Sequence, residues 1–200
     1  APPELGFLFP AFDDRAANIY NALFYTRKPS ELHQEFIDAV FHVEPPMSAA
    51  EQREVFESIL EDALGAGCSI EVAQAIHDQF SSQIREHKES KSTESLIVTA
   101  GEIGKVLLAC GVTEENVAAF QAQCGERFGV GAVLDPANLI DPGKYEVKTA
   151  QATIQVDPEF SYAVTTRVID GRAYLLLPAD DIQVNGLPIQ VTNGQETETI

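Results

Sequence analysis

The chain has 200 residues, of which 44% are hydrophobic, and its formal net charge is −18. This apolar share is typical of a globular rather than a disordered protein, and no apolar run reaches the ~18 residues that a membrane span requires. Nucleic acid and membranes are excluded as partners, because both need clustered Lys or Arg and the chain has no such cluster. The charge is compatible with a basic protein partner, and more simply with an acidic surface that keeps the protein soluble.

The chain begins without Met and enters an apolar run from Leu5 to Phe12. A signal peptide would carry an early Lys or Arg and a small-residue cleavage site, and neither is present. The run predicts a strand or core segment whose upstream neighbours are absent. We therefore expect this sequence to be the C-terminal portion of a longer protein.

The strongest polar cluster, Asp13-Asp14-Arg15, follows that run. Adjacent carboxylates can bind Mg²⁺ or act as acid and base once their pKa values are driven apart, which makes Asp13 and Asp14 the candidate catalytic residues. The simpler interpretation, which we favour, is an Asp N-cap for a helix. The apolar stripe of that helix would comprise Ile19, Tyr20, Leu23 and Phe24.

Capping and stop signals predict three further helices in the first part of the chain. They span 31–42 behind Ser30, 49–64 between the Ser48–Glu51 capping box and Gly65, and 70–89 behind Ser69. The polar stretch over 88–94 is typical of a linker. We therefore predict a helix-rich subdomain over residues 1–90 and an α+β subdomain over 95–191 that ends in β-hairpins.

The second part changes from helical to strand periodicity near Lys144. Its predicted elements are a strand at 96–98, a helix from the Thr99–Glu102 capping box to Cys110, a helix over 114–128 behind Thr113, and strands near 145–156, 162–169, 172–177, 181–184 and 187–191. Asp170-Gly171 and Asn185-Gly186 are strong hairpin signals, and the tail over 192–200 should be flexible. The predicted fold class is α+β, with an N-terminal helical layer followed by a small, mainly antiparallel β-sheet with hairpins.

No motif in the sequence predicts a cofactor or a metal. The stretch Gly101-Glu-Ile-Gly104-Lys105 is too short between its glycines for a phosphate loop, and a capped helix start explains it. His33 is expected on an apolar helix face. Asp38 and His42 are the one carboxylate–histidine pair at helical i, i+4 spacing, and a surface ion pair is a better explanation of it than a metal site.

The three cysteines predict reduced thiols rather than a disulfide framework. Cys110 and Cys124 lie on the apolar faces of two successive predicted helices, with Cys110 at the turn between them. Cys124 would then lie about 16 Å further along its helix, too far away for a disulfide. Cys68 is expected in a turn, and the absence of CxxC argues against a zinc site.

Five stretches of the sequence occur in an order that resembles one known family. They are Gly6–Arg15, Glu31–Ile37, Tyr145–Thr149, Val168–Arg172 and Val184–Gly186. Together they resemble the C-terminal half of the bacterial family called domain of unknown function 4317, over residues 5–191. The resemblance implies a bacterial, cytoplasmic protein from a family whose members are longer than this chain. It implies no activity, cofactor or catalytic residue.

Two hypotheses for function follow. The leading one is a non-enzymatic interaction or regulatory module of a longer cytosolic bacterial protein, whose sheet edges or aromatic run at 7–12 contact the absent N-terminal half or a protein partner. A homo-oligomer is compatible with it, and burial of Phe7, Phe9 and Phe12 would weaken it. The alternative is a hydrolase or transferase with a site between the two halves or shared with the absent half. A pocket that holds Asp13 or Asp14 beside a histidine would favour this alternative.

Overall fold

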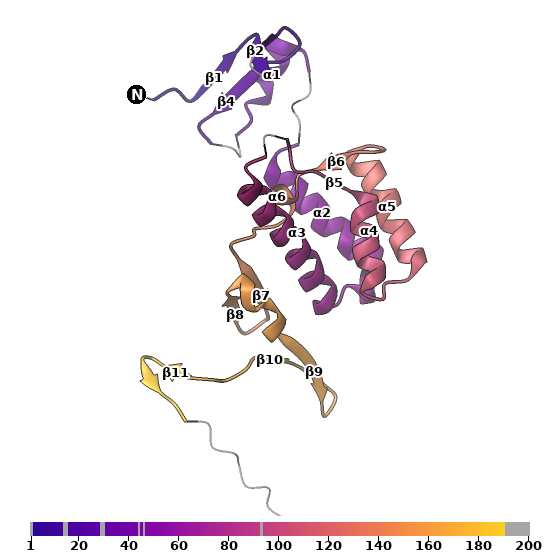
Figure 1. Ribbon diagram of the computed structural model, residues 1–200, viewed down its shortest axis with the longest axis vertical. Coiled ribbons are helices and arrows are strands. Elements are labelled where there is room, and N and C mark those ends of the chain that lie inside the picture. The colour runs from indigo at the N-terminus through magenta and orange to yellow at the C-terminus, as the bar shows by residue number, and fades with distance from the viewer. Residues whose placement is uncertain are drawn as a thin grey trace, which may run out of the picture.

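The computed structural model describes residues 2–13, 16–28, 31–43, 45, 47–92 and 94–190. The N-terminal strands and a short helix lie at one end, a helical body lies in the middle, and a series of C-terminal hairpins extends from the body at the other end (Figure 1). All strand pairs in these residues are antiparallel, and each sheet consists of two strands. The predicted α+β class is confirmed, although the strands form separate ladders instead of one sheet.

In the part of the chain that the structure describes, four short strands precede the first helix. They are β1 (Leu5–Leu8), β2 (Ala11–Asp13), β3 (Ala16–Asn18) and β4 (Leu23–Thr26), and they are followed by helix α1 (Gln34–Phe41). Strand β1 pairs with β4, and β2 pairs with β3. The strand predicted in the opening apolar run is thus confirmed as β1.

The helix predicted over Ile19–Phe24 is wrong. The Asn18 side chain accepts a hydrogen bond from the backbone N–H of Tyr20 at 2.9 Å, which forms a turn directly after β3. Leu23 and Phe24 then pair with Leu8 and Phe7 of β1. Pairing with a distant apolar strand therefore decides the structure of a segment whose apolar spacing also fits a helix.

Helix α1 begins at Gln34, three residues later than predicted, because His33 adopts a left-handed conformation with φ of 49°. His33 is therefore the N-cap and not part of an apolar helix face, while Ser30 lies outside the described residues. At the other end His42 also has a left-handed φ of 53°, and its backbone N–H donates to the carbonyl of Asp38. The predicted ion pair between the Asp38 and His42 side chains does not form, because His42 turns out of the helix.

The helical body contains the longest helices. They are α2 (Ala49–Leu64), α3 (Ile70–Ser90), α4 (Ala100–Ala109), α5 (Glu114–Phe128) and the short α6 (Pro136–Leu139), with a 3₁₀ turn η1 (Gly65–Gly67) after α2. Strand β5 (Val98–Thr99) pairs with β6 (Val133–Leu134) and so brings the chain after α5 back to the start of α4. The predicted bounds of α2 and α5 are confirmed, whereas β6 and α6 were not predicted.

Three phenylalanine rings occupy the centre of the hydrophobic core. Phe56 on α2 lies 6.2 Å from the ring of Phe80 on α3 and 6.2 Å from that of Phe120 on α5, and all three are buried. Leu134 and Leu139 belong to the same cluster. One continuous core is thus built from residues on both sides of the boundary predicted between 90 and 95.

Close contact between α4 and α5 explains one glycine of the stretch that was compared with a phosphate loop. A Cβ atom on Gly104 would lie 3.0 Å from Cγ1 of Val117 and 2.5 Å from Nε2 of Gln121. At the start of the same helix, Thr99 and Glu102 form the predicted capping box. Both features are those of a capped and closely packed helix.

The capping box of α2 makes a titration prediction. The Ser48 hydroxyl accepts from the backbone N–H of Glu51, and the Ser48 backbone N–H donates to the Glu51 carboxylate at 2.8 Å. Hydrogen bonding to Ser48, through its side chain first and its backbone second, holds the pKa of Glu51 below its ordinary value. The stabilisation by this carboxylate is therefore present at neutral pH and is lost as the pH falls through its folded-state pKa.

We expect the Ser48→Ala variant to raise the pKa of Glu51 toward its ordinary value, as measured by NMR titration of the side-chain carboxyl carbon. Glu102 is the internal control, because its pKa is lowered by the separate capping box with Thr99. An unchanged midpoint for Glu51, or an equal shift for Glu102, would contradict the assignment.

The C-terminal part is a succession of hairpins. Its elements are β7 (Tyr145–Lys148), β8 (Thr153–Val156), a 3₁₀ segment η2 (Pro158–Ala163), β9 (Thr165–Ile169), β10 (Arg172–Leu176), β11 (Gln183–Val184) and β12 (Leu187–Pro188). The single strand predicted over 145–156 is wrong, because Thr149 and Ala152 close a turn that folds it into the β7–β8 hairpin. Both predicted turns are confirmed, with positive φ at Asp170-Gly171 and Asn185-Gly186. The tail over 192–200 lies outside the described residues.

All three cysteines are free thiols. Cys124 lies on the buried face of α5 with Val117 and Phe120, as predicted. Burial raises the pKa of the Cys124 thiol to about 11. Cys124 is therefore a structural part of the core and is not an activated nucleophile.

Candidate functional site

The candidate catalytic residues Asp13 and Asp14 stay predictions, because neither side chain belongs to the described part of the structure. Asp13 ends β2, where it pairs with Ala16 of β3, and Asp14 lies outside the described residues. The cavity nearest to them in the chain has Leu8, Phe9, Ala11 and Phe12 among its lining residues, and no histidine is among the described residues that line it.

That cavity is an apolar groove of about 1020 Å³ between the N-terminal strands and α1. We call it the N-terminal groove. Its lining residues come from the first two strands and Phe9 between them, from β4 and the turn before it, and from α1 with its flanking residues. They are Leu8, Phe9, Ala11, Phe12, Tyr20, Asn21, Ala22, Leu23, Phe24, Leu32, Ile37, Phe41, Val43 and Pro45. Aromatic and aliphatic side chains therefore surround an open space at the N-terminal end of the structure.

Most of the large side chains around the N-terminal groove are exposed. The exposed fraction is 57% for Phe9, 72% for Phe12, 89% for Tyr20 and 61% for Leu23. Phe7 packs edge-on against Phe41, with ring centroids 5.4 Å apart, but half of its surface is still exposed. Contiguous apolar surface of this kind is typical of a site where another molecule binds.

Helix α1, whose Ile37 and Phe41 line the groove, carries two exposed carboxylates that are not lining residues. Glu35 and Asp38 are exposed on that helix, and neither makes an ion pair with another described residue. Lys28 is neutralised locally, because its ammonium group lies 2.8 Å from the carboxylate of Glu31. These carboxylates and the net charge of −18 favour a ligand that carries positive charge next to its apolar groups.

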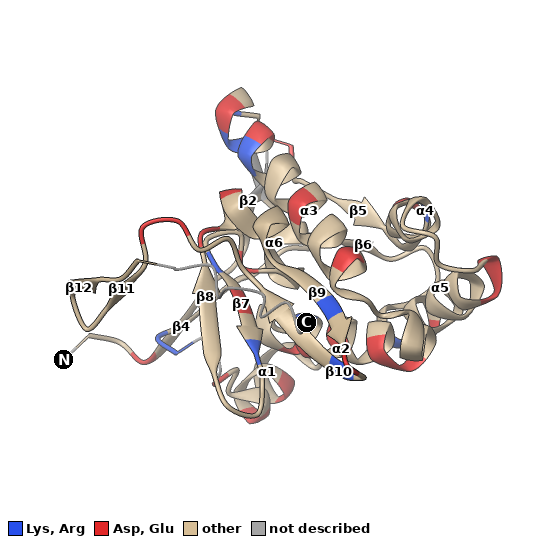
Figure 2. Ribbon diagram, turned by 90° about the horizontal axis from the view of Figure 1, so that it is seen from below, with Lys and Arg blue, Asp and Glu red and all other residues tan. Residues whose placement is uncertain are grey.

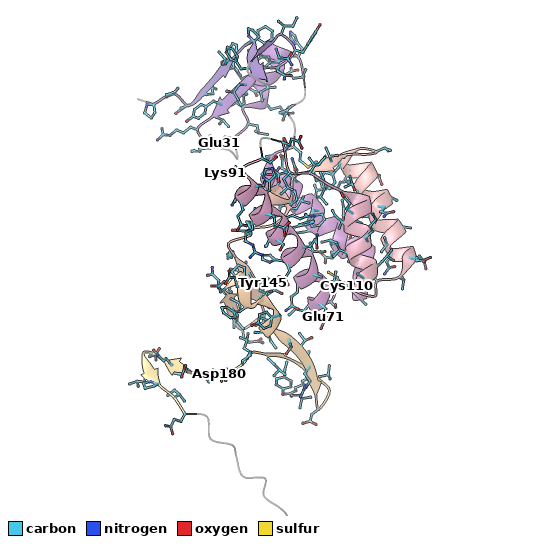
Figure 3. The ribbon with its side chains drawn as sticks, viewed as in Figure 1. Glu31, Glu71, Lys91, Cys110, Tyr145 and Asp180 are labelled. Atoms are coloured by element: carbon cyan, nitrogen blue, oxygen red, sulfur yellow. The ribbon has the colours of Figure 1, made fainter. Side chains whose placement is uncertain are left out.

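A second cluster of polar side chains joins α3 to the C-terminal part. His77 is buried on α3, and its Nε2 lies 3.2 Å from the carbonyl oxygen of Asp141. Because a carbonyl only accepts, Nε2 carries a proton, while Nδ1 lies 3.5 Å from the Ser81 hydroxyl and 3.8 Å from the Asp78 carboxylate. The ring of Tyr145 packs edge-on against His77 at 5.3 Å, where the C-terminal segment meets the helical body (Figure 3).

This cluster contains the residue types of a catalytic triad but does not connect them as a triad does. The Ser161 hydroxyl donates to the Asp78 carboxylate at 2.9 Å rather than to His77. Ser161 is 1% exposed, so it cannot reach a substrate. Ser81 does contact His77, and it lines a groove of about 680 Å³ between α3 and residues 142–162. The backbone N–H of Gly143 lines the same groove, but it already donates to the Asp141 side chain and is not free to bind a substrate oxygen. The cluster is best explained as the attachment of the C-terminal part to α3.

The sequence predicted a contact surface at the aromatic run over 7–12, but it predicted neither the other residues of the groove nor the contacts of His77. Tyr20, Leu23 and Phe24 were predicted on the apolar stripe of a helix, whereas in the structure they line the groove beside the aromatic run at 7–12. The contact of His77 gives no local sequence signal, because the Asp141 carbonyl lies 64 positions further along the chain.

The described residues contain neither a candidate metal site nor a helix suited to span a membrane. Within them, no three side chains of His, Cys, Asp or Glu form a group that could hold a metal ion. No helix in the same part of the chain combines the length and apolar character that a membrane span requires.

The fold and its surfaces define an α+β protein with an open aromatic groove at one end and projecting hairpins at the other. Residues 1–187 match the model of a family described as Domain of unknown function (DUF4317), and the chain therefore belongs to that family. This confirms the family expected from the sequence. No curated protein and no solved structure matches the chain.

Proposed function

We propose that the chain is a non-enzymatic interaction module, and that the N-terminal groove binds a protein segment whose apolar side chains are flanked by Lys or Arg. The observation that carries the proposal is the exposure of Phe9, Phe12, Tyr20 and Leu23 around one apolar groove. The proposal includes a cytosolic, bacterial setting and a place in the C-terminal half of a longer protein, which rest on the sequence resemblance.

The free energy gained by covering exposed apolar side chains favours an apolar ligand. Covering one exposed Phe or Leu side chain contributes about 1.5–3 kcal/mol, and several such side chains must offset the cost of association and ordering. Exposed Glu35 and Asp38, together with a net charge of −18, favour basic residues at the edges of the ligand. The unpaired outer edges of β1 and β4 in the described residues are also suited to main-chain pairing with an extended segment.

Selection of a random displayed-peptide library on the whole chain tests this proposal. We expect the enriched peptides to combine aromatic or aliphatic residues with flanking Lys or Arg. The double variant Phe12→Ser/Leu23→Ser should weaken binding of a selected peptide by about 30-fold or more, the effect of losing roughly 2 kcal/mol at an interface hot spot.

The matched control is Val130→Ser, which changes a 99% exposed apolar residue in the loop after α5. It should leave peptide binding unchanged, and circular dichroism should show that both variants fold. Failure to enrich any sequence, or binding that survives the double variant, would contradict the proposal.

The alternative of a hydrolase or transferase is favoured by one observation. The groove of about 680 Å³ lies between α3 and residues 142–162, hence between the two predicted halves, and the Ser81–His77 contact lies at its wall. A fluorophosphonate probe distinguishes the two proposals, because it labels activated serines. Labelling of the unmodified chain that is lost in Ser81→Ala would favour the enzyme, whereas an interaction module should not be labelled.

A further inference from the structure

The hairpin formed by β9 and β10, here called the C-terminal ribbon, is exposed except at Leu175 and Leu176, which are half-buried. All five residues of β9 are exposed, as are Arg172, Ala173 and Tyr174 of β10. The ribbon projects from the helical body (Figure 1). An isolated two-stranded hairpin is only marginally stable in water, and exposed Val168 and Tyr174 add apolar surface. A second surface that covers this ribbon would therefore stabilise it.

We propose that the C-terminal ribbon docks on the exposed acidic row of α2 in a second copy of this chain. The acidic row consists of Glu54, Glu57 and Glu61. This proposal concerns a surface separate from the N-terminal groove and does not depend on it.

One face of the ribbon carries both of its positive charges. The register places Arg167 opposite Tyr174 and Ile169 opposite Arg172. Because side chains alternate between the two faces of a strand, these four residues share one face. Neither arginine makes an ion pair with another described residue. This face therefore presents two unpaired guanidinium groups beside an aromatic ring and an aliphatic side chain.

The acidic row has the complementary arrangement. The spacing of Glu54, Glu57 and Glu61 places them on one face of α2, and all three are exposed. None of them makes an ion pair within the described residues. Figure 2 shows Asp and Glu positions in red along the helices and the basic positions of the ribbon in blue on β9 and β10.

The spacings also match. Arg172 lies opposite Ile169, so Arg167 and Arg172 are offset by two residues, or roughly 7 Å, along the ribbon. Glu57 and Glu61 are separated by about 6 Å along the helix. Each arginine can therefore meet its own glutamate, and the planar guanidinium group suits a carboxylate particularly well.

A second copy is the partner that these observations favour, because the chain itself supplies the acidic surface. Each ribbon can contact the α2 row of the other copy, so the same contact occurs twice about a two-fold axis. Two chains with a net charge of −18 repel each other, but at physiological ionic strength charges more than about 8 Å apart are largely screened. Charges in direct contact at the two ribbon sites therefore outweigh the distant ones.

A charge-swap experiment on the whole chain tests the proposal by analytical ultracentrifugation. The unmodified chain should be a dimer. Reversing the ribbon charges in Arg167→Glu/Arg172→Glu, or the row charges in Glu57→Arg/Glu61→Arg, should raise the dimer dissociation constant by about 100-fold or more, because four attractive contacts become repulsive. Mixing the two variants in equal amounts should restore a dimer, since each ribbon then meets a row of opposite charge.

The control Glu114→Arg/Glu126→Arg reverses two exposed charges on α5 and should leave the dimer intact. Circular dichroism checks that each variant folds. A monomeric unmodified chain, a dimer that persists in either charge-reversed variant, or a mixture of the two that stays monomeric would overturn the proposal.

Discussion

Replacing Phe120 with alanine is expected to lower the free energy of unfolding by about 3–5 kcal/mol. Phe120 is fully buried, and its ring meets that of Phe56 nearly at a right angle with centroids 6.2 Å apart. The surrounding side chains come from several helices of one cluster. Because those helices are fixed by their other contacts, they cannot close the cavity without losing contacts elsewhere. Urea unfolding followed by circular dichroism measures the change.

The control for this variant is Val130→Ala, which removes methyl groups from a side chain that is 99% exposed. Its effect should stay within about 0.5 kcal/mol. A loss of less than about 1 kcal/mol in Phe120→Ala would contradict the described core, because it would mean that the site collapses freely or is accessible to water.

Replacing Gln74 with leucine is expected to release the C-terminal part from α3. The Gln74 amide donates to the carbonyls of Ser161 and Val164, both at 2.7 Å. Ser161 is 1% exposed and Val164 is fully buried, so water does not replace the lost donor in the folded state. The Ser161 carbonyl keeps a second donor, the backbone N–H of Val164 at 3.0 Å, whereas loss of the Gln74 donor to the Val164 carbonyl costs about 1–3 kcal/mol. Leucine keeps most of the side-chain volume, which isolates the effect of the hydrogen bonds.

Hydrogen exchange measures the location of this effect. Amides of Val164 and of the β9–β10 hairpin should exchange faster in Gln74→Leu, whereas those of α4 and α5 should keep their protection. Gln79→Leu changes an exposed glutamine on the same helix and serves as the control. Unchanged exchange at Val164, or a uniform loss of protection over the whole chain, would contradict the anchoring role.

The sequence predicted best those elements whose ends are determined locally. Helix α2 follows the Ser48–Glu51 box and stops at Gly65, where a φ of 48° suits a residue without a Cβ atom. The hairpin turns at Asp170-Gly171 and Asn185-Gly186 are equally local. In each case the determining side chains lie within a few residues of the feature.

Elements that depend on distant partners were missed. Residues 23–26 are a strand because Leu5–Leu8 lies beside them, and the short β6 exists through its pairing with Val98 and Thr99. The candidate site followed the same rule. Asp13 and Asp14 attracted attention as a polar cluster, whereas the N-terminal groove arises when three separated segments come together around α1. The aromatic run at 7–12 indicated a contact surface, but the apolar residues that complete the groove are identified only once that packing is known.

The order in which the core is completed has a consequence for synthesis on the ribosome. Phe56 lies on the second helix, but its partner Phe120 is on the fifth, and the Arg53 guanidinium donates to the carbonyl of Ile140. A nascent chain therefore carries α2 and α3 with open apolar faces until Ile140 has emerged from the exit tunnel. The N-terminal groove needs only residues 8–45. It is complete at a stage of translation when the helical body is still unfinished.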